Sequence, residues 1–177
     1  MEKRLSSAAV AALCCLTWVS GCASNDGWSS SVPSPNGEQF ASEVYPLLLR
    51  DCAFSECHGA KDRFFQVFGP GRNRLDPDNT KPDGPATLTE VLHSYDRARS
   101  MLATSTQVEQ ALLLSKPLEL AAGGQGHRGA DGLGRNVFAS TREPGYVTLL
   151  RWARSRGDRP TAEDLDAALT AAMEAAP

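Results

Sequence analysis

Apolar residues recur along this chain at helical spacing, and no stretch alternates apolar and polar positions as a strand would. The first apolar stripe falls within residues 40–48 and predicts a helix that begins near Glu38 and carries Cys52 at its end. Pro46 lies inside this helix. Because proline has no backbone N–H, we expect a kink or a restart of the helix there.

Four further stripes predict helices downstream, over residues 87–102, 107–114, 144–156 and 161–173. Thr87 and Glu90 have the spacing of a capping box for the first of these helices. Thr161 with Asp164 caps the last one in the same way. Gly157 is expected to end the helix over 144–156 as the residue after its C-cap.

Two segments rich in glycine and proline interrupt the helices, at residues 69–84 and 123–134. The first contains several aspartates, but their spacing differs from that of a calcium-binding EF-hand, so we interpret it as a solvated loop. The second is a glycine-rich loop that carries His127. The sequence therefore predicts an all-α fold, a small helical domain with long Gly/Pro-rich loops.

The first 22 residues have the layout of a bacterial secretory signal. Lys3 and Arg4 form a basic start, and the apolar run over 8–19 is shorter than the roughly 20 residues that span a bilayer. Small residues then precede Cys22, which resembles the lipobox of bacterial lipoproteins. That resemblance implies lipidation of Cys22 and a membrane anchor. By resemblance to the sorting rules of envelope lipoproteins, Ala23 at the next position, in place of an aspartate, favours the outer membrane over the inner one.

The chain accordingly divides into a signal peptide over 1–21, a lipidated flexible tether over 22–37 and a helical domain over 38–177. The tether is rich in serine, asparagine, glycine and proline. Of the five cysteines, two leave with the signal peptide and Cys22 is capped by lipid. Cys52 and Cys57 remain in an oxidising compartment, where we expect them to be joined to each other, to a haem or to a metal.

The charge of the mature chain argues against nucleic acid as a partner. Removal of residues 1–21 leaves 16 basic and 20 acidic residues. No basic cluster is present of the kind that binds a phosphate backbone. No second apolar stretch approaches the length of a membrane span.

The two remaining cysteines lie in the motif Cys52-Ala-Phe-Ser-Glu-Cys57-His58. Haem c needs two thiols that form thioethers with its vinyl groups and an adjacent imidazole that binds the iron, which is the logic of the C-x-x-C-H signature. Here four residues separate the cysteines, a rarer form of the same arrangement. The motif predicts covalent haem c (iron) on Cys52 and Cys57, with His58 as the proximal ligand.

The order of residues around this motif resembles the cytochrome-c-like domains of bacterial envelope lipoproteins. The likeness covers about residues 37–157 and includes Cys57-His58-Gly59, the stretch Leu112–Pro117, the loop over 123–129 and a Tyr146-x-x-Leu149-x-x-Trp152 helix. It implies a distal iron ligand in the loop after residue 117. The family usually offers a methionine there, whereas this loop has His127.

The resemblance thus implies iron held by His58 and His127, with Met101 as a second candidate that we assign to the core. His93 lies off the buried stripe of its helix and is expected to be solvated. Two imidazoles would leave no open iron position, so the expected function is outer-sphere electron transfer and not catalysis. The expected partners are a redox protein of the periplasm or cell envelope and the lipid membrane, reached through Cys22.

Two alternatives stay open. Cys52 and Cys57 could form a disulfide, worth roughly 2 kcal/mol in the chain-entropy model, in a haem-free lipoprotein that serves as a binding or structural module. A zinc site of Cys52, Cys57, His58 and His127 is disfavoured, because adjacent Cys57 and His58 can hardly bind one tetrahedral ion together. No nucleophile motif such as G-x-S-x-G indicates an enzyme.

Overall fold

The computed structural model describes residues 32–127, 137–155 and 157–174. Within these ranges the chain is helical and contains no strand, which confirms the all-α prediction. None of the helices there has the length and apolar character needed to cross a membrane. The elements are α1 (Gly37–Gln39), the π-helical turn η1 (Phe40–Val44), α2 (Tyr45–Asp51), α3 (Leu88–Leu102), the 3₁₀ turn η2 (Val108–Gln110), α4 (Leu112–Ser115), the 3₁₀ turn η3 (Leu120–Ala122), α5 (Pro144–Arg154) and α6 (Ala162–Glu174).

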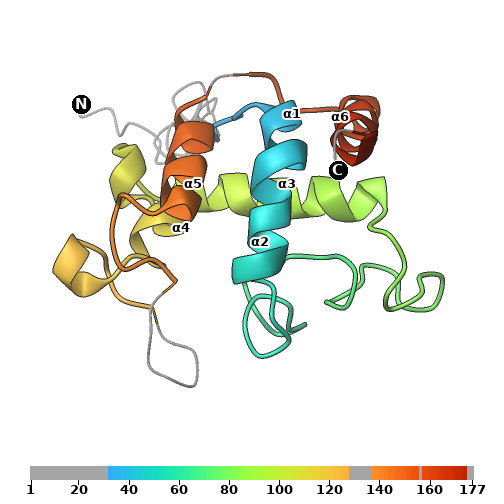
Figure 1. Ribbon diagram of the computed structural model, residues 1–177, viewed down its shortest axis with the longest axis horizontal. Helices are drawn as coiled ribbons and strands as arrows, with labels where there is room; N and C mark the ends of the chain where they lie inside the picture. Colours follow the sequence, from blue (N-terminus) through green and yellow to red (C-terminus); the bar gives the residue numbers. More distant parts are fainter. Residues whose placement is uncertain (1–31, 128–136, 156, 175–177) are drawn as a thin grey trace, which may run out of the picture. The chain divides into compact units, whose positions relative to one another are not determined.

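The first helical stretch runs without a break from Gly37 to Asp51 through α1, η1 and α2 (Figure 1). Pro46, where a kink or a restart was expected, lies in the first turn of α2. Proline has no N–H to donate to the preceding turn, and that turn is the wider π-helical η1.

α3 passes behind α2 in Figure 1 and packs against α2, α4 and α6. The core between these helices contains three large aromatic side chains, Phe40, Tyr95 and Trp152, all without solvent exposure. The centroid of the Phe40 ring lies 5.2 Å from that of Tyr95 and 5.2 Å from that of Trp152. This cluster joins the first helical stretch to α3 and α5, as the apolar stripes of all three predict.

The end of the expected tether, over residues 32–36, is held by the helical domain. The Trp152 indole N–H donates to the carbonyl of Asn36 at 2.9 Å, and the Tyr95 hydroxyl donates to the carbonyl of Pro35 at 2.7 Å. Both hydrogen bonds come from buried side chains of the core. The domain thus includes residues before the expected boundary at 38. Cys22 and the remainder of the tether lie outside the described residues.

Both predicted helix caps are present. The Thr87 hydroxyl accepts from the Glu90 N–H at 3.2 Å, and the Glu90 carboxylate accepts from the Thr87 N–H at 2.9 Å. Thr161 and Asp164 form the equivalent pair before α6, with distances of 3.2 and 2.8 Å. These reciprocal bonds satisfy N–H groups that a helix start leaves unpaired.

Two predicted helix boundaries are wrong. The helix expected over 107–114 is divided into η2 and α4, because Ala111 between them is extended, with φ −61° and ψ 144°. The helix expected to end at Gly157 ends at Arg154, because Ser155 is extended, with ψ 156°. The Ser155 hydroxyl accepts from the Asn36 N–H at 2.8 Å, so it ties the helix end to the incoming chain.

A buried ion pair organises the loop between α2 and α3, which the sequence indicated only as a solvated segment. Arg74 Nε donates to Glu90 Oε1 at 2.8 Å, and the two side chains are 4% and 1% exposed. Arg74 also donates to the carbonyls of Gly84 and Pro85, each at 2.9 Å. Glu90 therefore serves the helix cap and the loop at once. The aspartates of this loop are exposed, as expected.

Candidate functional site

The cysteine–histidine motif forms a tight loop at the end of α2. Cys52 is the C-cap of that helix, and its carbonyl accepts from the His58 N–H at 3.1 Å. The Phe54 carbonyl accepts from the N–H groups of Cys57 and Gly59, at 2.8 and 3.0 Å. A Cβ atom on Gly59 would lie 2.3 Å from the carbonyl oxygen of Ala53. Glycine is therefore required directly after His58 for the loop to close this far.

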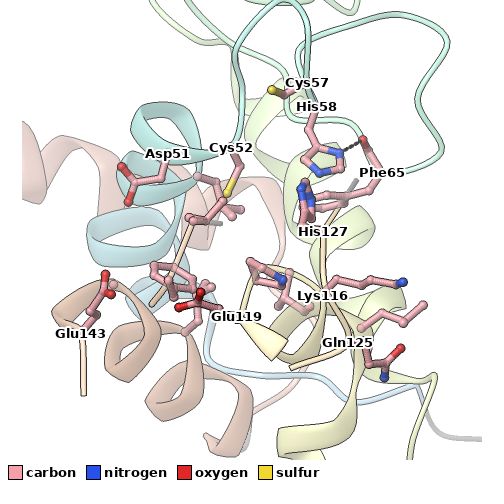
Figure 2. A pocket seen from close by; sticks show the side chains of 18 of the residues that line it. Asp51, Cys52, Cys57, His58, Phe65, Lys116, Glu119, Gln125, His127 and Glu143 are labelled. Carbon is pink, nitrogen blue, oxygen red and sulfur yellow. Dashed lines mark hydrogen bonds between the residues drawn. The ribbon is translucent and has the colours of Figure 1, made fainter. Parts of the chain in front are cut away.

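The His58 side chain is fixed by one backbone hydrogen bond. Its Nδ1 lies 2.8 Å from the carbonyl oxygen of Phe65 (Figure 2). Because a carbonyl can only accept, Nδ1 carries the proton and Nε2 presents a lone pair. Histidines that bind metals usually have their second nitrogen held in this way. The Phe65 ring lies edge-on to the imidazole, with centroids 4.7 Å apart.

The same surroundings keep His58 uncharged at neutral pH. Burial lowers the pKa of the His58 imidazole below its ordinary value of 6.5, and the neighbouring His127 ring and the Arg63 guanidinium act in the same direction. The hydrogen bond to the Phe65 carbonyl opposes this shift without reversing it. Since a metal ion binds the neutral imidazole, His58 has both the orientation and the neutral protonation state that a metal ligand needs.

His127 reaches the same region from the loop after η3. Gly123 and Gly126 take positive φ values of 91° and 73°, which other residues rarely adopt. A Cβ on Gly124 would lie 1.9 Å from the carbonyl oxygen of Leu118, so this glycine allows the close approach of two chain segments. These glycines turn the chain so that His127 faces the cysteine–histidine loop (Figure 2).

The two imidazoles predicted as iron ligands are brought together. The ring centroids of His58 and His127 lie 5.7 Å apart, with an angle of 67° between the planes. Two imidazoles that bind one metal ion from opposite sides, at about 2.0–2.1 Å each, have centroids roughly 6 Å apart. Burial, followed by the charge of Lys116, lowers the pKa of His127, so this ring is also neutral at pH 7.

A cavity of about 1660 Å³ opens beside these two rings. Its volume exceeds the roughly 300–1,000 Å³ of typical small-molecule sites. Both cysteines and both histidines line it (Figure 2). Its apolar wall comes from α2, α3, α4, α5 and the segment before α5 and includes Leu48, Met101, Leu113, Phe138 and Leu149. The cavity therefore has the size and the mixed lining that a large, mostly apolar ring would need.

Cys52 and Cys57 are both free thiols and both partly exposed, and both line the cavity. Burial of the sulfur, together with the nearby Asp51 carboxylate, raises the pKa of Cys52 to about 12. Cys52 is thus a protonated thiol at neutral pH. Their shared loop brings the two sulfur atoms to the same wall as His58 (Figure 2).

Met101 and His93, the other residues singled out from the sequence, take the expected places. Met101 is buried in the core and also contributes to the cavity wall, and His93 is exposed. The phenylalanines that follow the motif lie in different surroundings: Phe64 is 74% exposed, whereas Phe65 lines the cavity and Phe68 is buried.

The donor set fits a haem better than a bare metal ion. Among the described residues, no group of three His, Cys, Asp or Glu side chains is arranged to hold a metal. The zinc alternative would need four converging ligands. A haem iron is bound by four porphyrin nitrogens and needs only two further ligands from the protein. His58, His127, two thiols and the large cavity together meet that requirement.

The sequence did not indicate two features of the site. The Phe65 carbonyl that orients His58 is a backbone atom, and no side-chain pattern marks it. The charged residues of the cavity rim, Lys116, Glu119 and Glu143, come from separate loops and helix ends.

Comparisons of the chain with protein-family models, with curated proteins and with solved structures found no match.

Proposed function

We propose that this chain is an electron carrier with one covalently bound haem c, attached through Cys52 and Cys57. The observation that carries the proposal is the state of His58. This imidazole has Nδ1 bonded to a carbonyl, its Nε2 has no hydrogen bond to the described residues, and it stands beside two free thiols on the wall of one large cavity. When bound, haem c supplies an iron that alternates between the ferrous and ferric states.

In this proposal His58 and His127 would together hold the iron. The 5.7 Å between the two ring centroids supports this pairing. With both imidazoles on the iron, no position would stay open for oxygen or peroxide. The protein then transfers electrons without making or breaking bonds to a substrate. A pair of histidines also gives a lower reduction potential than a histidine–methionine pair.

The remaining cavity residues keep water away from the ring and hold the ligands still. Leu48, Leu113, Phe138 and Leu149 supply apolar contacts on the side of the helices. Phe65 supports His58 through both its ring and its carbonyl. A ligand that cannot reorient changes little between the two oxidation states, which favours fast electron transfer.

The cellular setting of the proposal comes from the sequence. The signal layout before Cys22 supports a lipid-anchored protein of the bacterial cell envelope that faces the periplasm, with the outer membrane as the favoured location. Its partners would be the lipid membrane, through Cys22, and a redox protein of the periplasm or envelope. The cytochrome-c-like resemblance of residues 37–157 supports the same assignment.

The test is the intact mass and the visible spectrum of the full chain, expressed with a haem-c maturation system. We expect a mass gain of one haem and a sharp Soret band, both lost in the Cys52→Ser/Cys57→Ser variant. His93→Ala serves as the matched control, because this exposed histidine lies outside the cavity and its loss should leave the spectrum unchanged. A colourless wild-type protein that has lost two hydrogens would refute the proposal and favour the disulfide-containing binding module.

A further inference from the structure

The charged residues around the cavity are not evenly distributed. Figure 2 shows Asp51, Glu119 and Glu143 toward one side, and Lys116 on the other side, beyond His127. Asp51 ends α2, near Cys52, and Glu143 is the N-cap of α5. Lys116 is the C-cap of α4. An anionic group inside the cavity would be repelled by the three carboxylates and attracted toward Lys116.

Among the residues that the structure describes, Lys116 is also the cavity-lining lysine or arginine without an ion-pair partner. Arg50, the other lysine or arginine among the lining residues, is engaged by Asp51 through two hydrogen bonds of 2.7 Å each. Within the described part of the chain, no carboxylate lies within ion-pair distance of Lys116. Its ammonium is exposed and close enough to His127 to affect that imidazole by its charge.

We propose that Lys116 binds a propionate carboxylate of the haem and thereby sets the orientation of the ring in the cavity. This inference rests on the proposed function. The vinyl groups lie on one edge of a haem and the two propionates on the opposite edge. Thioethers at Cys52 and Cys57 would hold the vinyl edge at the cysteine wall. The propionate edge then points away from that wall, toward the part of the cavity where Lys116 lies.

The pairing has a consequence for electron transfer. A propionate next to the iron stabilises the ferric state, because its negative charge offsets the extra positive charge of the oxidised centre. The Lys116 ammonium compensates that carboxylate, so it favours the reduced state. Lys116 is therefore a positioning residue that also tunes the reduction potential, whereas His58 and His127 bind the iron itself.

The experiment compares the reduction potential and the resonance Raman spectrum of haem-loaded wild type, Lys116→Met and Lys116→Arg. We expect Lys116→Met to lower the equilibrium constant for reduction two- to tenfold, where tenfold equals about 59 mV for one electron. The propionate bending band should shift in the same variant. Lys116→Arg keeps the charge and should stay close to wild type in both measurements.

Lys81→Met is the matched control, because it removes the same charge from an exposed lysine that does not line the cavity. It should change neither the potential nor the propionate band. An unchanged propionate band in Lys116→Met would overturn the inference, whether or not the potential moves, and the haem would still be bound. A wild-type protein without haem would instead refute the proposed function itself.

Discussion

Replacement of Arg74 by methionine should destabilise the domain strongly, although Arg74 lies outside the cavity. The guanidinium and the Glu90 carboxylate are 4% and 1% exposed and share two hydrogen bonds, at 2.8 and 2.9 Å. Arg74 further donates to the carbonyls of Gly84 and Pro85. Its removal leaves a buried carboxylate without its cation and leaves these carbonyls without their donor.

The expected loss is about 3–5 kcal/mol, the cost of breaking a buried ion pair by removing one partner. Single domains have unfolding free energies of about 5–15 kcal/mol, so the variant should lose roughly a fifth or more of its stability. The assay is urea unfolding of wild type and Arg74→Met at pH 7, monitored by circular dichroism. The comparison uses the unfolding midpoint and the slope of the unfolding free energy against urea concentration. A lower midpoint at unchanged slope identifies a change in stability.

A double-mutant cycle isolates the interaction. Glu90→Gln removes the charge that Arg74→Met would leave unpaired, so the combined variant should be less destabilised than the sum of the two single variants. Additive effects would mean that the two side chains do not interact across this distance. A loss below about 1 kcal/mol in Arg74→Met would refute the argument that burial makes this pair essential.

Three further predictions follow from the site and its supports. In the proposed haem carrier, His127→Ala should keep the covalent haem but shift the spectrum toward high spin, and an unchanged low-spin spectrum would remove His127 from the iron. Gly59→Ala should lower the yield of haem-loaded protein, because its Cβ would lie 2.3 Å from the Ala53 carbonyl oxygen. Gly157→Ala, with 3.5 Å to the nearest atom, is its control and should be tolerated. The free energy of unfolding should decrease as the pH is lowered. Burial raises the pKa of Glu90, but the hydrogen bonds from Arg74 and from the Thr87 and Leu75 N–H groups outweigh burial. They hold the pKa of Glu90 below its ordinary value of 4.5. A carboxylate with a lowered folded pKa stabilises the fold above its unfolded pKa and loses this contribution as the pH falls through the folded one. Urea unfolding between pH 6 and pH 3 should therefore show a steeper decline in wild type than in Glu90→Gln, and parallel curves would contradict the assignment.

Much of the fold follows from local signals in the sequence. Apolar spacing predicts the first helix, α3, α5 and α6, and the two capping pairs mark the starts of α3 and α6 correctly. These features depend on residues within one or two turns of each other. The errors are found where distant segments decide the backbone. Ser155 leaves the helix because its hydroxyl accepts from Asn36, which lies 119 residues away in the sequence.

The residues of the candidate site can likewise be divided into those that the sequence predicted and those that it did not. Cys52, Cys57 and His58 lie close together in the chain, so their spacing alone indicates a common function. The position of His127 beside His58 depends on the fold, and a resemblance suggested it where periodicity could not. The hydrogen bond that sets the His58 tautomer could not be predicted at all, because its acceptor is the backbone of Phe65.

The segment that contains the Phe65 carbonyl is held by hydrogen bonds that reach into the core. The stability of the core and the orientation of His58 are therefore connected. Phe68, three residues after Phe65, donates its N–H to the Ser94 hydroxyl at 3.1 Å, and its carbonyl accepts from the Tyr45 hydroxyl at 2.7 Å. Ser94 in turn donates to the Glu90 carbonyl at 2.8 Å, one turn earlier on α3. The residue that pairs with Arg74 thus also anchors the segment that orients His58. Loosening this pair should therefore disturb the orientation of His58 before the helices themselves unfold.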